Sequence, residues 1–181
     1  MRTLKTEGII IKRRNSGEAD RFVTLFTKDL GKISVKAQGV RKIDSKRSSH
    51  IELLNHSVLS LYKGAKYLTL IEVQTIQDFS AIKSDLEKVG FAFHICELID
   101  GLCPENQENP EIYMLLRNTL EKLAYVDNMA IFIHGFEVEL LTLLGFWYQG
   151  EEAGKNLDTH NFIENIMERK LKSHKIFSKM Q

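Results

Sequence analysis

Apolar and polar residues alternate along most of the first eighty positions, with the period of two that is typical of half-buried β-strands. In the segment 33–37, Ile33, Val35 and Ala37 face one way while the polar residues between them face the other. Turn-forming residues, such as those at 15–18, separate the apolar runs. The pattern predicts strands at about residues 8–12, 21–27, 33–37, 55–62 and 67–78. Five strands without an intervening helix favour a small closed or nearly closed barrel.

After Phe79 the apolar residues recur with the period of a helix. Ser84, followed three residues later by Glu87, predicts a capping box at the start of a first helix. The apolar stripe of this helix comprises Leu86, Val89, Phe93, Cys96 and Leu102, although Phe91, Ile95, Leu98 and Ile99 make the helix apolar on more than one side. Pro110 predicts the first position of a second helix, because proline there loses no hydrogen bond. The apolar face of the second helix comprises Ile112, Leu115, Leu116, Thr119, Leu120 and Leu123.

Two further helices complete the predicted order of elements. Asp127 and Asn128 open a third helix that ends near Gly145, and a last helix starts at Asp158 or Thr159 and runs to about Lys172. Strands followed by helices are typical of an α+β fold or of two domains. We therefore predict a β-barrel domain over residues 1–80 and an all-helical domain over residues 81–181.

The charge of the chain divides between the same two halves. The formal net charge is only +1, but residues 1–80 hold 15 Lys and Arg against 8 Asp and Glu, whereas residues 81–181 hold 10 against 16. Such asymmetry indicates two domains with different partners. A basic barrel is suited to phosphates, whose binding gains affinity from the release of counterions.

Ten cations form the basic set of the first half. They are Lys12, Arg13, Arg14, Arg21, Lys32, Lys36, Arg41, Lys42, Lys46 and Arg47. All of them except Lys32 are our candidate nucleic-acid-binding residues. Four lie in the loop at 39–49, where they meet a single acid, and a solvated charge run is the alternative interpretation there. Tyr62 and Tyr67 are candidate platforms for base stacking, while Phe22 and Phe26 fit the core equally well.

The sequence contains none of the motifs that would indicate catalysis. There is no glycine-rich phosphate loop, no nucleophile elbow and no carboxylate pair in a catalytic context, so we expect no enzyme and no cofactor. His94 with Glu97, and His134 with Glu137, have i, i+3 spacing and are interpreted as solvated pairs rather than metal ligands.

Two cysteines, Cys96 and Cys103, are the full complement of the chain. Seven residues along one helix separate them by about 10 Å, too far for a disulfide, so we expect small buried or half-buried apolar side chains. Two cysteines spaced in this way cannot supply the usual paired zinc ligands. No apolar run has the length of a membrane helix, and a cytoplasmic location without membrane attachment is expected.

Taken in order, the motifs of the chain resemble those of the RecO family of bacterial recombination mediators. The segments of the first half that carry the resemblance are TEGII at 6–10, GEADR at 17–21, LFT at 25–27, GK at 31–32, GVRK at 39–42, SKR at 45–47 and LYKG at 61–64. Those of the second half are ELID at 97–100, NP at 109–110, FEVELL at 136–141, LGF at 144–146 and LKSHKIF at 171–177.

The resemblance implies an oligonucleotide-binding (OB) barrel followed by an all-helical domain. It also implies a mediator that binds single- and double-stranded DNA, anneals complementary strands and assists the loading of RecA. The implied protein partners are RecR and the acidic C-terminal tail of single-stranded-DNA-binding protein (SSB). Many members carry a four-cysteine zinc module after the position of Gly145 and Phe146, but residues 147–156 contain no cysteine, so we expect no metal.

An acidic SSB tail would need cations in the acidic half of the chain. The candidate partner-binding residues are Arg169, Lys170, Lys172 and Lys175, with Arg117 and Lys122 as the next choice. Cations at the end of a helix can instead complement the helix dipole. The alternative to a DNA-binding mediator is a protein-interaction adaptor in which the basic loop is solvated and the chain does not bind DNA.

Overall fold

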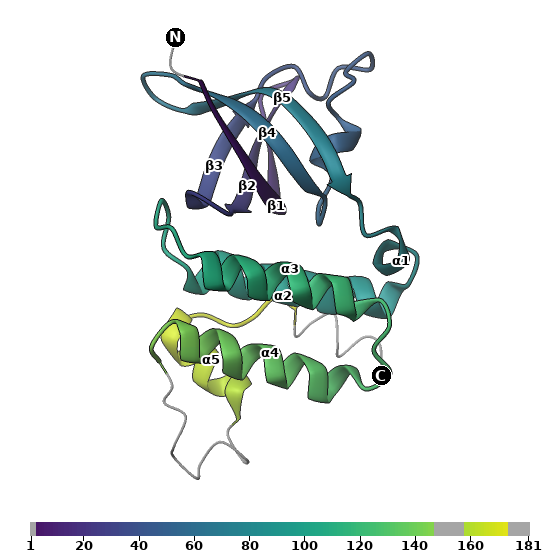
Figure 1. The fold of residues 1–181 in the computed structure, drawn as a ribbon, viewed down its shortest axis with the longest axis vertical. Coiled ribbons are helices and arrows are strands. Elements are labelled where there is room, and N and C mark those ends of the chain that lie inside the picture. Colours follow the sequence, from purple (N-terminus) through teal and green to yellow (C-terminus); the bar gives the residue numbers. More distant parts are fainter. Residues whose placement is uncertain (1–2, 147–157, 174–181) are drawn as a thin grey trace. The chain divides into compact units, whose positions relative to one another are not determined.

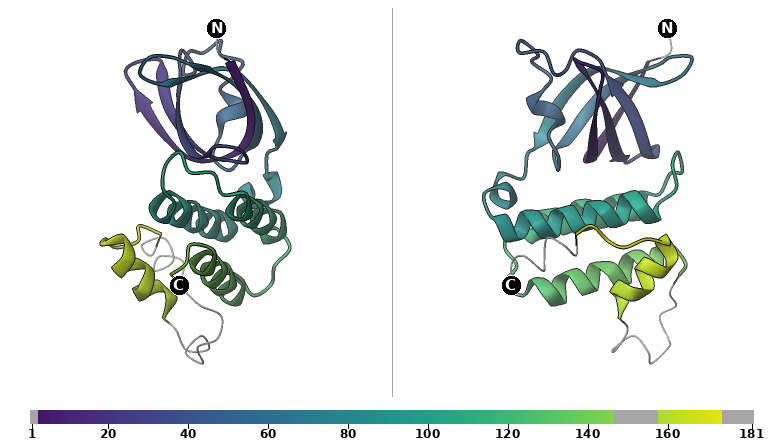
Figure 2. Two further views of the ribbon diagram at one scale, coloured as in Figure 1. Left: turned by 60° about the vertical axis from the view of Figure 1, so that its left-hand side comes forward. Right: turned by 180° about the vertical axis from the view of Figure 1, so that it is seen from behind.

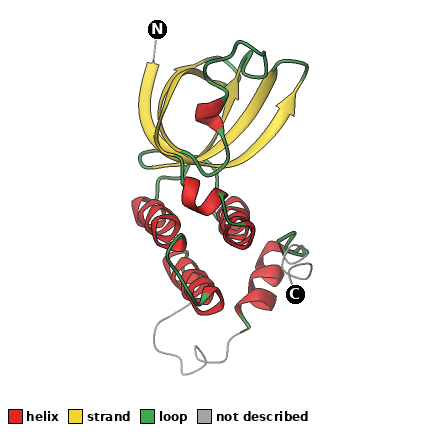
Figure 3. Cartoon of the chain, turned by 90° about the vertical axis from the view of Figure 1, so that its right-hand side faces the viewer, coloured by secondary structure: helices red, strands yellow, loops and turns green. Residues whose placement is uncertain are grey.

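The chain was analysed in a computed structural model that describes residues 3–146 and 158–173. It divides into two compact units, Met1–Phe79 with Pro104–Tyr113, and Ser80–Cys103 with Met114–Gln181. All five strands belong to the first unit, as Figure 3 shows in yellow. None of the helices in the described ranges is long and apolar enough to cross a membrane.

The five strands close into a barrel, visible as a ring in the left view of Figure 2. They are β1 (Thr3–Ser16), β2 (Asp20–Thr27), β3 (Gly31–Ala37), β4 (His56–Lys63) and β5 (Leu68–Gln77). The order around the barrel is β1-β2-β3-β5-β4, and the short parallel pairing of β3 with β5 closes it (Figure 1). The predicted OB-fold barrel is confirmed.

Strand β1 is longer than the sequence pattern indicates, because it pairs with two neighbours. Its first half, from Thr3 to Ile9, pairs with β4, and its second half, from Gly8 to Ser16, pairs with β2. A bulge between Ile10 and Lys12 interrupts the alternation, so the consecutive residues Ile9, Ile10 and Ile11 are all buried. Because the bulge breaks the alternating pattern, the sequence does not show that the strand continues into the charged segment that follows.

The barrel interior is filled by the alternating apolar residues of the strands, together with two residues of the connection between β3 and β4. This core comprises Ile10, Val23, Leu25, Ile33, Val35, Ala37, Val40, Ile51, Leu59, Leu61 and Leu70. Ile51 lies in the short 3-10 helix η1 (Ser49–Ile51). Because Val40 and Ile51 are fully buried, they fix the basic loop at both of its ends.

The segment Pro104–Tyr113, which follows the first long helix, belongs to the barrel unit. The Tyr113 hydroxyl lies 2.8 Å from His56 Nε2 and donates to Glu7 Oε1 over 3.1 Å. Tyr113 and His56 are both buried, so these bonds satisfy polar groups that would otherwise be costly. The barrel unit therefore includes residues that come after residue 80.

The second unit is helical. Its elements are α1 (Ser80–Lys83), α2 (Leu86–Leu102), the part of α3 (Pro110–Leu123) from Met114 onward, α4 (Met129–Leu143) and α5 (Thr159–Met167). Contacts join α2 to α4 and α5, and α4 to α5. The all-helical second part of the predicted fold is confirmed.

The second and third predicted helices start where their capping residues indicate. The Ile112 amide donates to Asn109 Oδ1 over 3.0 Å, so Pro110 takes the first helical position as predicted. The six residues predicted for the apolar face of α3 are all buried. The Ile131 amide likewise donates to Asn128 Oδ1, which places the start of α4 as predicted.

Three details of the predicted helices were wrong. The N-cap of α2 is Asp85, which accepts from the amides of Glu87 and Lys88, because Ser84 is used to close the turn of α1. In the predicted stripe of α2, Leu86 is 78% exposed, since the buried side comprises Ala92, Ile95, Cys96, Leu98 and Ile99. Helix α5 ends at Met167 rather than near Lys172, because Glu168 takes a left-handed conformation with φ of 51°.

Candidate nucleic-acid interface

The outer surface of β1, β2 and β3 carries a row of cations and one aromatic residue. Strand pairing sets Arg14 opposite Phe22, and Phe22 opposite Lys36. Because Val23 and Leu25 point into the barrel, Phe22 points outward, where it is half-buried. In the sequence, the alternation of Phe22 with Val23 could therefore have indicated that Phe22 is not part of the barrel core. Phe26, by contrast, is 1% exposed and lies among buried residues.

Two aromatic rings and two cations form one cluster at this surface. The rings of Phe22 and Tyr67 meet edge to face, with centroids 5.2 Å apart and an interplanar angle of 70°. The guanidinium of Arg14 lies 5.5 Å from the Phe22 centroid, and the ammonium of Lys66 lies 5.3 Å from that of Tyr67. We call Arg14, Phe22, Lys66 and Tyr67 the aromatic-cation cluster. Aromatic faces beside cations are what a single strand of nucleic acid requires.

Several of the nine candidate cations have partners within the chain. Arg13 forms an ion pair with Glu52 at 2.6 Å, and Arg21 donates to Asn15 Oδ1 over 3.1 Å. The Glu52 carboxylate reduces the charge that Arg13 offers to a phosphate, whereas Asn15 occupies one donor of Arg21 and leaves its charge unchanged. Lys12 and Arg14 are exposed on β1.

Lys36 is held by a carboxylate at the first residue of β2. Its ammonium lies 3.1 Å from Asp20 Oδ2, and the Gly39 amide donates to Asp20 Oδ1 over 2.8 Å. The Gly39 amide and the Lys36 ammonium hold the pKa of Asp20 below its ordinary value, so the carboxylate stays ionised. Lys36 therefore links the basic loop to the row of cations on the outer surface of the barrel.

The four cations of the basic loop divide into two kinds. Arg47 donates to the carbonyls of Gln38 and Leu70 over 2.7 and 2.9 Å, and Arg41 donates to the carbonyl of Gly17 over 3.0 Å. These arginines hold the loop against the β1–β2 turn and β5. Lys42 and Lys46 are exposed. Sequence reasoning treated all four as equivalent.

Lys32, the tenth cation of the basic set, is not part of an exposed surface. It is 6% exposed, and the Asn106 amide donates to its carbonyl over 2.8 Å. The segment that follows α2 thus covers the start of β3. Because a phosphate contact requires an exposed cation, Lys32 does not belong with the basic set.

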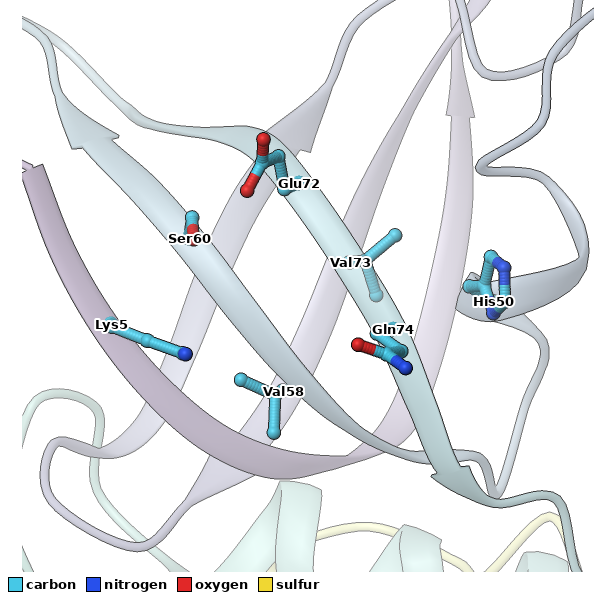
Figure 4. Close-up of a pocket in the computed structure, with 7 residues that line it drawn as sticks. All are labelled: Lys5, His50, Val58, Ser60, Glu72, Val73 and Gln74. Atoms are coloured by element: carbon cyan, nitrogen blue, oxygen red, sulfur yellow. The ribbon is translucent and has the colours of Figure 1, made fainter.

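The structure also contains a groove on the outer side of β1, β4 and β5, with a volume of about 530 Å³ (Figure 4). Its lining comprises Lys5, His50, Val58, Ser60, Glu72, Val73 and Gln74. The Thr75 amide donates to His50 Nδ1 over 3.3 Å, which leaves Nε2 to carry the proton of a neutral ring. None of the predicted site residues lines this groove, and it combines one lysine, Lys5, with one acid, Glu72, rather than concentrating positive charge.

The two histidine–glutamate pairs of the helical unit were predicted wrongly. His94 does not pair with Glu97: its Nε2 lies 2.8 Å from Glu137 Oε1 on α4, and its Nδ1 lies 2.8 Å from Ser173 Oγ. His94 and Glu137 are 1% and 6% exposed, so the pair is buried rather than solvated. The Thr159 hydroxyl also donates to Glu137 Oε2. Burial raises the pKa of Glu137, but the hydrogen bonds from His94 and Thr159 outweigh it and lower that pKa.

Glu97 has a different set of partners, all in the segment after α5. It accepts the amides of Lys172 and Ser173, both over 2.9 Å, and the guanidinium of Arg169 over 2.7 Å. Burial raises the pKa of Glu97, but these donors outweigh the effect of burial and lower the pKa to about 2. Glu97 therefore fastens this segment to α2.

The candidate partner-binding cations lie in that same segment. Arg169 pairs with Glu97 as described, and Lys170 pairs with Glu164 at 2.6 Å. Lys172 is exposed, and Lys175 lies outside the described residues. An acidic partner tail would thus compete with carboxylates of this chain for two of the four cations.

The cysteines are as predicted from their spacing. Cys96 and Cys103 are both buried and unbridged, and burial raises the pKa of Cys96 to about 12, so it is not a reactive thiolate. Within residues 3–146 and 158–173, no three His, Cys, Asp or Glu side chains are grouped so that they could hold a metal ion.

Comparison with known proteins gives matches along most of the chain. Residues 1–79 match the family model "Recombination protein O N terminal" and residues 83–152 match "Recombination protein O C terminal". The chain is 42% identical over 142 residues to "DNA repair protein RecO" of Dehalococcoides mccartyi strain 195, covering 78% of this chain and 56% of that protein. It is 36% identical over 147 residues to the protein of the same name from Acetivibrio thermocellus, covering 81% and 59%. The chain therefore spans just over half the length of these curated relatives.

Proposed function

Because this chain belongs to the RecO family of DNA repair proteins, we propose that its barrel binds DNA as part of a recombination mediator. Single-stranded and double-stranded DNA are the proposed ligands. The mediator would anneal complementary strands and assist RecA loading, without catalysing a reaction itself. RecR and the acidic tail of SSB are the proposed protein partners.

The aromatic-cation cluster is the observation that carries the proposal. Tyr67 is 42% exposed, and Phe22 and Arg14 lie beside it on strands whose inner side chains form the barrel core. A base can stack on the rings while the cations and the exposed Lys12, Lys42 and Lys46 attract the phosphates. Lys36, Arg41 and Arg47 support this surface by fixing the loop and strand that carry it.

A salt titration with the full chain tests the proposal. We expect a labelled oligothymidine to bind, with log K falling linearly against log salt by about 0.7 for each phosphate contact. The full chain is needed because Tyr113 hydrogen-bonds to His56 within the barrel unit, so an isolated segment 1–80 lacks part of that unit. Absence of salt-dependent binding would reject the proposal.

A protein-interaction adaptor is the second candidate function. It is favoured by the exposed apolar residues of the helical unit, where Leu86, Tyr125 and Ile131 are 78, 83 and 71% exposed. Large exposed apolar side chains are suited to protein contacts. An adaptor would bind a partner protein with the same affinity after Tyr67→Ala, and would show no salt-dependent binding of DNA.

For the acidic SSB tail, we retain Arg169, Lys170, Lys172 and Lys175 as the proposed site. The three described members are all exposed, and Arg169 and Lys170 would exchange Glu97 and Glu164 for carboxylates of the tail. An SSB tail peptide should bind the full chain more weakly after Lys172→Glu. The matched control is Lys83→Glu, which changes an exposed lysine on α1 of the same helical unit. Equal affinity in both variants would place the tail elsewhere.

A further inference from the structure

Ile43 lies in the basic loop between β3 and η1 and has a relative exposure of 109%. It is the most exposed large apolar side chain in the described part of the molecule. An apolar side chain stabilises a fold when it is buried away from water. A fully exposed isoleucine therefore does not stabilise the fold of the free protein. The side chain is therefore available to a ligand.

The loop holds Ile43 in a defined position. The Lys42 amide donates to the Gly39 carbonyl over 3.2 Å, and the Ser45 amide donates to the Lys42 carbonyl over 3.0 Å, so Ile43 lies in the second of two consecutive turns. Arg41 and Arg47 fasten the two sides of the loop through the carbonyls described above. A side chain presented by a preformed loop binds without a large loss of conformational entropy.

The residues around Ile43 favour nucleic acid over protein as the ligand. Exposed Lys42 precedes it and exposed Lys46 follows, with Asp44 as the single acid. Lysine is depleted in the buried centre of protein interfaces. Proteins that insert an isoleucine or leucine between base steps, by contrast, commonly surround it with cations that contact phosphates.

The loop is also continuous with the candidate DNA surface. The Gly39 amide and the Lys36 ammonium bind the two oxygens of Asp20, and Lys36 lies opposite Phe22 in the strand pairing. The base of the loop is thus anchored to the row that includes the aromatic-cation cluster. One strand of DNA could contact both features of the barrel unit.

We propose that Ile43 inserts between adjacent bases of the DNA bound to the barrel and unstacks that step. The inference rests on the proposed function, since it requires the barrel to bind DNA. Unstacking opposes the gain from burying the side chain, so Ile43 alters the conformation of the bound strand more than its affinity.

The test measures both affinity and stacking with the full chain. The probe is a single-stranded oligonucleotide carrying 2-aminopurine at every third position, whose fluorescence rises when the base is unstacked. The variants are Ile43→Ser, Ile43→Leu and the matched control Ile131→Ser, which changes an exposed isoleucine on α4. Ile43 and Ile131 are both largely exposed, so neither serine variant should disturb folding.

At saturating protein, we expect the wild type, Ile43→Leu and Ile131→Ser to raise the fluorescence equally. Ile43→Ser should lose most of that rise while the Kd changes by less than about fivefold, because unstacking and burial offset each other. A rise that survives in Ile43→Ser, or DNA binding by the wild type without any rise, overturns the inference and leaves the proposed function intact. Unchanged DNA behaviour with weakened binding of a protein partner would make Ile43 a protein contact and would also overturn it. No DNA binding by the wild type rejects both.

Discussion

The imidazole Nε2 of His94 on α2 lies 2.8 Å from Glu137 Oε1 on α4, and both side chains are buried. Because ionised Glu137 can only accept hydrogen bonds, Nε2 carries the proton in this contact. Thr159 donates to the other carboxylate oxygen and Ser173 lies against Nδ1. The pair thus joins four segments of the helical unit at one point.

Glu137→Ala should destabilise the chain by about 3–5 kcal/mol, because it leaves His94 and Thr159 buried without their acceptor. Glu139→Ala, which changes an exposed glutamate on the same helix, should cost about 0.5 kcal/mol or less. Urea unfolding of the full chain measures both values. Similar midpoints for the two variants would show that the buried pair does not stabilise the unit.

Glu97→Gln should remove a pH-dependent part of the stability. The pKa of Glu97 is lowered from 4.5 to about 2 in the folded chain, so ionised Glu97 stabilises the fold above pH 4.5, and this contribution is lost as the pH falls from 4.5 towards 2. We therefore expect wild type and Glu97→Gln to differ most at neutral pH and to converge in acid. Thermal melts between pH 3 and 7 test this, with Glu139→Gln as the control. A constant difference across that range would contradict the assignment.

Lys42→Ala combined with Lys46→Ala should weaken DNA binding without altering the fold. Both residues are exposed, so the slope of log K against log salt should fall by about 1.4, at about 0.7 per single-strand contact. Changing Arg47 would be a poorer test, because it also removes hydrogen bonds to Gln38 and Leu70. Lys63→Ala with Lys122→Ala, which changes two exposed lysines outside the loop, is the control. The same slope in both double variants would exclude the loop from the interface.

Tyr67→Ala should weaken binding of single-stranded DNA by about 1–3 kcal/mol if one base stacks on the ring. Tyr67→Phe keeps the aromatic face and should bind with nearly wild-type affinity. Tyr125→Ala removes a ring that is 83% exposed in the helical unit and serves as the control. Fluorescence anisotropy at fixed salt gives the three affinities. If Tyr67→Ala and Tyr67→Phe bind equally, Tyr67 is not a stacking platform.

The candidate site could be predicted only in part from the sequence. Clustering of cations in the first half was visible, but Arg13, Lys36 and Arg47 have internal partners at Glu52, Asp20 and the carbonyls of the loop and β5. A charge count treats a paired and an exposed cation alike. Phe22 could have been assigned to the outer surface from its alternation with Val23 and Leu25, whereas its edge-to-face contact with Tyr67 requires the closed barrel.

What the sequence determined by itself is the kind and order of the elements. Alternation over residues 33–37, Pro110 at a helix start and the apolar face of α3 depend on neighbours within a few residues, where chain geometry fixes which side chains share a face. Only the tertiary structure decided which distant groups meet. His94 hydrogen-bonds to Glu137, 43 residues away, and not to Glu97 one turn along its own helix. A buried polar side chain has no water to bond with, so it pairs with the internal group that the fold places within reach.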